Sequence, residues 1–237
     1  MIIRELKAFE DDRGNRIEYT GEHAREVKIT IRGENNRIAI DSTARLGRFV
    51  VDMDCDNGSL TIGAGQGAPP LNATIRIGQD STVTIGDNVS STNTCVISAT
   101  EGTSVTIGND VMLASQNQIR ADDGHAIFDV ETGDRVNVSR SISIGNHVWL
   151  GMGAAVLGGA SIGDGTVIGY GSLVTRALPN NCVAVGTPAK VIRRNVAWER
   201  AHLSLSKPFY KPDASTVEKS SYWHMTEDPE DDSSEQD

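Results

Sequence analysis

The sequence predicts an all-β protein whose short strands coil into a parallel β-helix. From Ser141 to Thr175, a large aliphatic residue recurs at every sixth position, at Ile144, Leu150, Val156, Ile162, Ile168 and Val174. Small residues lie four positions further on, at Val148, Ala154, Ala160, Thr166 and Ser172. A period of six fits neither a helix nor a simple alternating strand, so each unit of six forms one strand and one corner. Three such sides close a triangular coil, and coils of this kind stack into a β-helix.

Turn-forming residues mark the corners of the predicted coil. Glycine follows the large aliphatic at Gly145, Gly151, Gly163 and Gly169, with Asn146, Asp164 and Gly165 nearby. These residue types tolerate the left-handed backbone angles that tight corners require. We therefore expect the large aliphatic side chains to point inward and the small residues to sit where the chain bends.

A looser form of the repeat extends the predicted β-helix over residues 36–178. Apolar pairs begin at Ile38, Leu60, Val83, Val105 and Ile142, separated by 22, 23, 22 and 37 residues. The first three intervals exceed one coil by a few residues, which we assign to enlarged corners. The last interval holds about nineteen residues beyond one coil, which predicts a loop that projects from the stack over about residues 117–141. Long excursions from a regular scaffold are often functional.

The two ends of the chain are predicted to differ from the regular stack. Residues 1–35 are polar and irregular, and we expect them to cap the first coil, because an open β-helix end is an exposed sheet edge. Residues 179–225 form a C-terminal extension, with a short helix expected from Val196 to Leu205. The acidic residues 226–237 are expected to be disordered.

Composition narrows the class of protein. The formal charge is −10, but the last residues carry seven of the negative charges, so the rest has no strong field of either sign. No basic surface for nucleic acid is therefore expected. Cys55, Cys95 and Cys182 are far apart and odd in number, which favours free thiols in a reducing compartment. Without a signal-peptide pattern or a membrane-spanning apolar run, the expectation is a soluble cytoplasmic protein.

The repeat resembles that of the left-handed β-helix hexapeptide-repeat acyltransferases. The segment GTPAKVIRRN, from Gly186 to Asn195, is similar to the ending of the acetyl-CoA enzymes of that family. The segment DDGHAIFDVETGDRVN, within the predicted loop, is similar to the loop of bacterial capsule and polysialic-acid O-acetyltransferases. The resemblance, not the spacing, implies a left-handed coil, acetyl-CoA as acetyl donor and a homotrimer with the donor between adjacent β-helices.

His125 is the strongest candidate catalytic residue. It follows Asp122 and Asp123 and precedes Asp129 in the predicted loop. An imidazole titrates near neutrality, and a nearby carboxylate can fix its tautomer. Taken alone, this pattern also fits a solvated loop histidine. The resemblance implies that His125 is the general base that deprotonates the acceptor.

Trp149 is predicted to face outward, because Val148 and Leu150 on either side are inward positions. It is either a packing residue at a subunit contact or, as the resemblance implies, a residue beside the acetyl group or the acceptor. Residues near His125 either shape the acceptor site or satisfy loop backbone groups: Arg120, Asp123, Arg135 and Asn137. His147 is expected to be an exposed corner residue without a catalytic role.

The resemblance also assigns residues to the acetyl-CoA path. They are Met152, Tyr170, Thr175, Arg176, Lys190, Arg193 and Arg194. Basic side chains in this set would meet the phosphates of coenzyme A. Tyr170 and Arg176 depart from the small residue and the lysine usual in the family, and Arg193 and Arg194 also fit a solvated helix start.

The sequence therefore predicts an acetyl-CoA-dependent O-acetyltransferase that acts on a sugar hydroxyl of a bacterial polysaccharide. Two alternatives are an N-acetyltransferase of an aminosugar on the same fold and a non-catalytic β-helix protein. A zinc hydratase of the carbonic anhydrase type would need three histidines around the metal. Only His125 and His147 lie in the coiled region, so no metal is expected.

Overall fold

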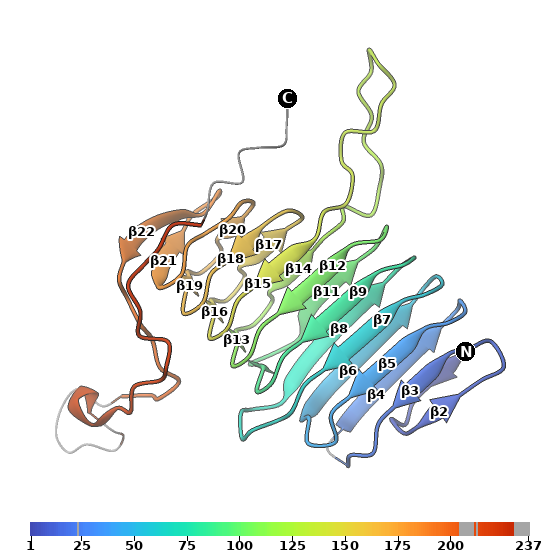
Figure 1. The fold of residues 1–237 in the computed structure, drawn as a ribbon, viewed down its shortest axis with the longest axis horizontal. Coiled ribbons are helices and arrows are strands. Elements are labelled where there is room, and N and C mark those ends of the chain that lie inside the picture. The colour runs from blue at the N-terminus through green and yellow to red at the C-terminus, as the bar shows by residue number, and fades with distance from the viewer. Residues whose placement is uncertain (23, 204–210, 212, 230–237) are drawn as a thin grey trace.

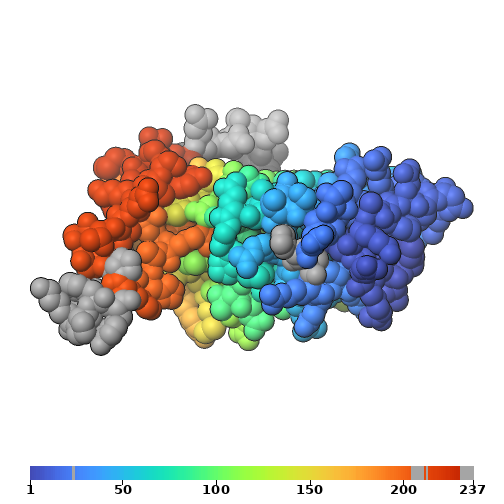
Figure 2. All heavy atoms as spheres, turned by 90° about the horizontal axis from the view of Figure 1, so that it is seen from below, coloured from blue at the N-terminus to red at the C-terminus, as the bar shows by residue number. Residues whose placement is uncertain are grey.

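The computed structural model describes residues 1–22, 24–203, 211 and 213–229, and within them the chain is a parallel β-helix (Figure 1). One 3₁₀ helix, Ala214–Thr216, is the helical segment of the described residues. No helical segment among them could span a lipid bilayer. Figure 2 shows an elongated molecule with the N-terminal residues at one end and the C-terminal residues at the other. The all-β prediction is confirmed.

The strands of the described residues form three sheets. The first sheet contains β1 (Ile2–Ile3), β4 (Ala24–Ile31), β6 (Leu46–Met53), β8 (Leu71–Ile77), β11 (Cys95–Ala99), β14 (Gln118–Arg120), β17 (Ala155–Leu157) and β20 (Leu173–Val174). The second contains β2 (Phe9–Glu10), β3 (Arg16–Glu18), β5 (Arg37–Ile40), β7 (Ser59–Ile62), β9 (Thr82–Ile85), β12 (Ser104–Ile107), β15 (Ile142–Ile144) and β18 (Ser161–Ile162). The third contains β10 (Ser90–Ser91), β13 (Met112–Leu113), β16 (Trp149–Leu150), β19 (Val167–Ile168), β21 (Cys182–Val185) and β22 (Lys190–Arg194).

Backbone hydrogen bonds between successive coils hold the stack together. In the strict repeat, the amide of Trp149 donates to the carbonyl of Thr166 at 2.9 Å, and the amide of Gly151 donates to that of Ile168 at 2.7 Å. Side chains extend this ladder at the corner after β15, where the amide of Asn146 donates to Asp164 Oδ1 at 2.7 Å. The corner also requires glycine, since a Cβ at Gly145 would meet the same Oδ1 at 2.3 Å.

The interior is filled by the predicted aliphatic residues. All six members of the strict repeat, from Ile144 to Val174, are buried, as are the small residues at the bends. The earlier pairs beginning at Ile38, Leu60 and Val83 are buried in the same core. The inward and outward assignment made from the six-residue period is therefore confirmed.

Both ends of the chain differ in detail from the expected boundaries. β3 pairs in parallel with β5, and β4 with β6, so the coiled stack begins before residue 36. At the other end, β21 continues the third sheet by pairing with β19. The helix expected from Val196 is absent from the described residues up to 203, which are irregular; residues 204 and 205 lie outside them.

The start of the acidic segment, which we expected to be disordered, contacts the stack. Thr226 Oγ1 donates to the carbonyl of Asn181 at 2.7 Å, and the amide of Glu227 donates to Asn180 Oδ1 at 2.7 Å. Asp228 forms an ion pair with Arg194. Residues 230–237 lie outside the described residues.

Truncating one inward side chain of the strict repeat should destabilise the stack. We expect Ile144→Ala to lower the free energy of unfolding by about 2–5 kcal/mol, because the buried side chain leaves a cavity between coils. Ser143→Ala, on the exposed face of the same strand, is the matched control. Urea unfolding followed by circular dichroism measures the difference, and equal losses for both variants would contradict the inward assignment.

Candidate functional site

The most prominent irregular feature is the projecting loop, residues 121–141, which leaves the stack after β14 and returns at β15 (Figure 1). It therefore arises at a corner between the first and second sheets. The two limbs are joined where the amide of Val136 donates to the carbonyl of Ile127 at 2.9 Å, and Phe128 forms an antiparallel bridge with Arg135. The excursion expected from the long interval between Val105 and Ile142 is present.

Asn137 ties the lower part of the loop together. Its Nδ2 donates to Asp123 Oδ2 at 2.9 Å and to the carbonyl of His125 at 2.8 Å, while its Oδ1 accepts from the amide of Ile127 at 2.7 Å. Asp123 and Asn137 thus satisfy loop groups, one of the two interpretations left open by the sequence. Arg120 lies apart from this cluster and donates to Gln118 Oε1 at 2.9 Å.

Glu101, which the sequence analysis missed, anchors the loop to the preceding coil. Arg135 donates to its two carboxylate oxygens at 2.7 and 3.0 Å, and Ser139 Oγ donates to it at 2.5 Å. These hydrogen bonds hold the pKa of Glu101 at about 2. The local sequence signal was the neighbouring Gly102, which is typical of a turn. The structure shows Glu101 itself at such a turn, with a left-handed φ of 58°.

The His125 side chain is exposed on this anchored loop. Its carbonyl is fixed by Asn137, but its imidazole has no hydrogen-bond partner among the described residues of this single chain. The three nearby aspartates are engaged elsewhere: Asp122 with Ser98, Asp123 with Asn137, and Asp129 with loop amides. Among the described residues, no carboxylate hydrogen-bonds to the imidazole of His125.

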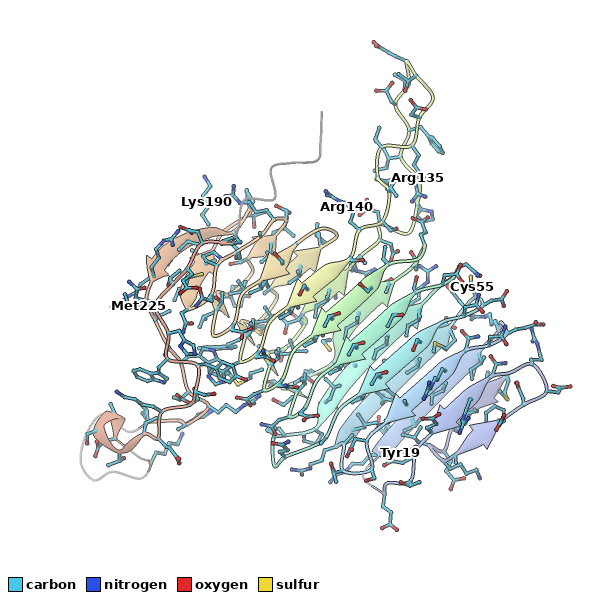
Figure 3. All side chains as sticks on the ribbon, viewed as in Figure 1. Tyr19, Cys55, Arg135, Arg140, Lys190 and Met225 are labelled. Carbon is cyan, nitrogen blue, oxygen red and sulfur yellow. The ribbon has the colours of Figure 1, made fainter. Side chains whose placement is uncertain are left out.

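Two hollows flank the base of the loop. The smaller, of about 230 Å³, is lined by Gly124 and Ala126 on either side of His125, together with Asp54, Arg76 and Arg135. The larger, of about 460 Å³, is lined by Asp123, Asn137, Ser139, Arg140, Leu157 and Thr175. Figure 3 shows Arg135 on the loop and Arg140 where the loop rejoins the stack. A hollow of about 730 Å³ around Phe9 and Tyr19, at the N-terminal end, contains no predicted site residue.

Charged groups in the smaller hollow form a network centred on Arg76. Its Nε donates to Asp54 Oδ2 at 2.7 Å, and its Nη1 lies 3.6 Å from Asp122 Oδ1. The hydrogen bond to Asp54 raises the pKa of Arg76. The other oxygen of Asp54, Oδ1, is buried without a hydrogen-bond partner among the described residues. Glu101 and Arg135, which also line this hollow, have partly exposed side chains and give it a polar wall.

The residues expected along the acetyl-CoA path fall in three places. Met152 and Tyr170 are exposed at successive corners between the third and first sheets, linked by the bond from the amide of Gly171 to the carbonyl of Met152 at 2.9 Å. Thr175 and Arg176 are exposed beyond β20, at a corner between the first and second sheets. The remaining basic residues, Lys190, Arg193 and Arg194, lie on β22.

Trp149 faces outward as predicted, with 37% of its surface exposed. It lies on β16 of the third sheet, whereas the loop that carries His125 arises at the corner between the first and second sheets. Within one chain, the two residues are therefore on different sides of the triangular stack, and the structure does not bring them together.

His147 contradicts the expectation of an exposed corner residue. It is 2% exposed, and its ring is stacked between Trp198, with centroids 4.2 Å apart, and Tyr222, at 4.8 Å. Its Nδ1 lies 2.6 Å from Asp110 Oδ2 and its Nε2 lies 2.8 Å from the carbonyl of Trp198. Burial disfavours the charged ring, but the hydrogen bonds outweigh it and raise the pKa of His147.

Other chemistries find little support among the described residues. No group of three or more His, Cys, Asp or Glu side chains in these ranges is arranged to hold a metal ion. Cys95 is buried, and burial raises the pKa of its thiol to about 12. Burial also raises the pKa of Cys182, so neither thiol is poised as a nucleophile.

Fold and loop together define a hexapeptide-repeat β-helix with an anchored histidine-bearing excursion. The family model for bacterial transferase hexapeptide (six repeats) matches residues 141–176. The crystal structure of the polySia-specific acetyltransferase NeuO superimposes with a TM-score of 0.69 and 32% identity, covering 79% of this chain and 89% of that chain. This chain therefore belongs to the hexapeptide-repeat acetyltransferases.

Named relatives narrow the comparison within that family. The polysialic acid O-acetyltransferase of Neisseria meningitidis is 29% identical over 175 residues, which cover 73% of this chain and 80% of that protein. The enzyme of the same name from Escherichia coli O1:K1 / APEC is 38% identical over 101 residues, covering 43% of this chain and 33% of that protein. The chain spans 33–43% of the length of the first three curated relatives that it matches.

Removing the charge of Glu101 should loosen the projecting loop. In Glu101→Gln, the paired hydrogen bonds from Arg135 are weakened, and we expect proteolytic cleavage in the loop to rise by up to about fivefold, the range for an exposed ion pair. Glu131→Gln, at an exposed place on the same loop, is the control.

The anchor should also respond to acid. Because the pKa of Glu101 is lowered from 4.5 to about 2, its contribution is complete above about pH 4.5 and is lost as the pH falls through about 2. Hydrogen exchange at the Ser139 amide, compared between the native chain and Glu101→Gln, should converge at the acidic end. Identical exchange at neutral pH would show that Glu101 is not the anchor.

Proposed function

We propose that this protein is an acetyl-CoA-dependent O-acetyltransferase that acetylates a hydroxyl of a bacterial polysaccharide such as a sialic acid polymer. The observation that supports this most is the exposed His125, whose chain neighbours Gly124 and Ala126 line a polar hollow at the base of the loop. It is supported by relatives, named polysialic acid O-acetyltransferases, that align over most of the chain. A cytoplasmic location, predicted from the unpaired cysteines, is part of the same proposal.

The proposed reaction is a direct transfer without an acyl-enzyme. His125 accepts the proton of the sugar hydroxyl as its oxygen attacks the thioester carbonyl carbon. The carbon–sulfur bond then breaks, the thiolate of coenzyme A takes up a proton, and the sugar leaves as its acetyl ester. The backbone amides of Trp149 and Gly151 already donate to the next coil, so we assign the stabilisation of the oxyanion to the indole N–H of Trp149. A positioned base contributes on the order of 100- to 10,000-fold, and holding both substrates together removes part of the entropic barrier.

The acceptor is placed in the smaller hollow. Its lining includes the partly exposed carboxylate of Glu101 and the guanidinium groups of Arg76 and Arg135, which can accept and donate hydrogen bonds. The hollow therefore suits the hydroxyl groups of a sugar. Gly124 and Ala126 in its lining bring the sugar next to His125.

The donor is placed along the third sheet and its edge. Met152 and Tyr170 offer exposed apolar surface to the pantetheine arm, while Lys190 and Arg193 offer positive charge to the phosphates. Arg194 already pairs with Asp228, so its charge is partly neutralised. Thr175 and Arg176 lie on the side of the stack from which their own loop arises, so they would contact the donor from the chain that supplies His125.

The opposite placement of His125 and Trp149 supports a site built from two chains. We propose a homotrimer, a closed arrangement in which the loop of one chain reaches the third sheet of its neighbour. The loop carries exposed apolar side chains that suit such a contact: Ile127, Phe128, Val130, Val136 and Val138.

Replacing His125 should abolish most turnover while leaving donor binding intact. We expect His125→Ala to lower kcat about 100- to 10,000-fold, since only the proton acceptor is removed, with unchanged acetyl-CoA affinity by calorimetry. The control is His202→Ala, an exposed histidine outside the loop. The acceptor panel should contain polysialic acid, other glycans and aminosugars. Normal turnover of His125→Ala would overturn the base assignment, and preference for aminosugars would favour N-acetylation.

Mixed trimers test whether the site lies between chains. His125→Ala and Trp149→Ala should each keep only a small residual activity. When the two are co-expressed, a site that takes its histidine and tryptophan from different chains recovers about a quarter of native activity, because random mixing leaves about one site in four intact. No recovery above the separate variants would place both residues within one chain and contradict the proposal.

A further inference from the structure

The C-terminal extension returns to the stack beside Trp149. Asn181 Nδ2 donates to the carbonyls of Val196 at 3.0 Å and Tyr222 at 2.6 Å, which fixes two separate segments of the extension. Arg200 Nε donates to Asp110 Oδ1 at 2.7 Å, and its Nη1 donates to Ser90 Oγ at 2.8 Å. Figure 1 shows this part of the chain running back along the coils that carry β13 and β16.

The ring of His147 packs between these two segments of the extension. Its ring is parallel to those of Trp198 and Tyr222, at interplanar angles of 14° and 4°. Both ring nitrogens face acceptors, the Asp110 carboxylate and the Trp198 carbonyl. Both hydrogen bonds can form together only when each nitrogen carries a hydrogen, so the geometry selects the imidazolium.

The surroundings of His147 support this charged form. Asp110 faces Nδ1 and is itself paired with Arg200. Glu199 lies near enough to favour the positive charge and accepts hydrogen bonds from the Ser220 amide and Trp223 Nε1. The phenol of Tyr222 is neutral, and burial raises its pKa further.

Trp198 is immobilised by this arrangement and contacts Trp149. It is 8% exposed, its Nε1 donates to the His147 carbonyl at 2.8 Å, and one ring face lies on the imidazole. Its ring centroid is 5.8 Å from that of Trp149, with a tilt of 47°, an arrangement that aromatic pairs favour. Trp149 itself is only partly covered, so the fixed indole restricts where its ring can lie.

We infer that Trp198, locked by His147, is a positioning residue that sets the orientation of Trp149 in the catalytic site. The inference rests on the proposed function, in which Trp149 lies beside the acetyl group. It makes the C-terminal extension part of the active site, although the extension contributes no group that touches the reacting atoms.

The first test measures orientation without requiring activity. The chain has three tryptophans, so Trp198→Phe/Trp223→Phe and Trp198→Ala/Trp223→Phe each leave Trp149 as the sole fluorophore. We expect higher anisotropy of Trp149 in the Phe variant, where an aromatic ring still packs against it. Equal anisotropy in both variants overturns the inference, whether or not the protein acetylates a polysaccharide.

The second test asks whether Trp198 acts through Trp149. We expect Trp198→Ala to lower kcat by about 2- to 12-fold, the range for an aromatic pair, with little change in the KM for acetyl-CoA. In a Trp149→Ala background, the same substitution should have no further effect on kcat. Trp198→Phe should recover most of the loss. Independent, multiplicative effects of the two substitutions would indicate a merely structural role and overturn the inference.

The third test addresses the stacking of His147 between Trp198 and Tyr222. At the equivalent corner of an earlier coil, Asn88 adopts the same left-handed backbone, with φ of 58° against 51° at His147. His147→Asn therefore keeps the corner and removes the ring.

The pKa of His147 is raised above 6.5. The packing of the C-terminal extension on His147 should therefore be complete below pH 6.5 and weaken as the pH rises through the raised pKa. In Trp198→Phe/Trp223→Phe, the fluorescence anisotropy of Trp149 should fall as the pH rises over this range. Adding His147→Asn to this variant should lower the anisotropy and remove its dependence on pH. An anisotropy that does not depend on pH either with or without His147→Asn would contradict the role of His147.

Discussion

The structure depends on the register between one coil and the next. A coil can satisfy its backbone groups only by donating to and accepting from the coils on either side, as the amides of Trp149 and Gly151 do. The six-residue period keeps strand above strand and corner above corner, so each inward aliphatic meets another from the neighbouring coil. The long insertion before β15 enters at a corner, whereas β6 takes up a single extra residue between Leu46 and Phe49. The register between coils, on which the core depends, therefore also limits where the projecting loop can leave the stack.

The candidate site follows from this geometry. The projecting loop arises at a corner between the first and second sheets, and Glu101 from the preceding coil fixes it through Arg135. Trp149 lies on the third sheet, where the strand alternation turns it outward. A triangular stack cannot bring these two sides together, so the chemistry we propose depends on a second chain. The C-terminal extension then restricts Trp149 through Trp198.

Features with a short sequence period could be predicted, whereas long-range contacts could not. The buried Ile144 and Val156, the outward Trp149 and the excursion before Ile142 follow from spacing alone. β3 and β4 were not recognised as coils because the early repeat carries extra residues at its corners. Glu101 was missed because its partner, Arg135, lies 34 residues further along the chain. His147 was expected to be exposed because its cover comes from Trp198, 51 residues away, and from Tyr222.

The most direct measurement of the central claim is a crystal structure of His125→Ala with acetyl-CoA and a sialic acid oligomer bound. The account predicts that the thioester lies against Trp149 of one chain while a sugar hydroxyl lies between it and position 125 of a neighbouring chain. A thioester bound away from position 125 of every chain would contradict it.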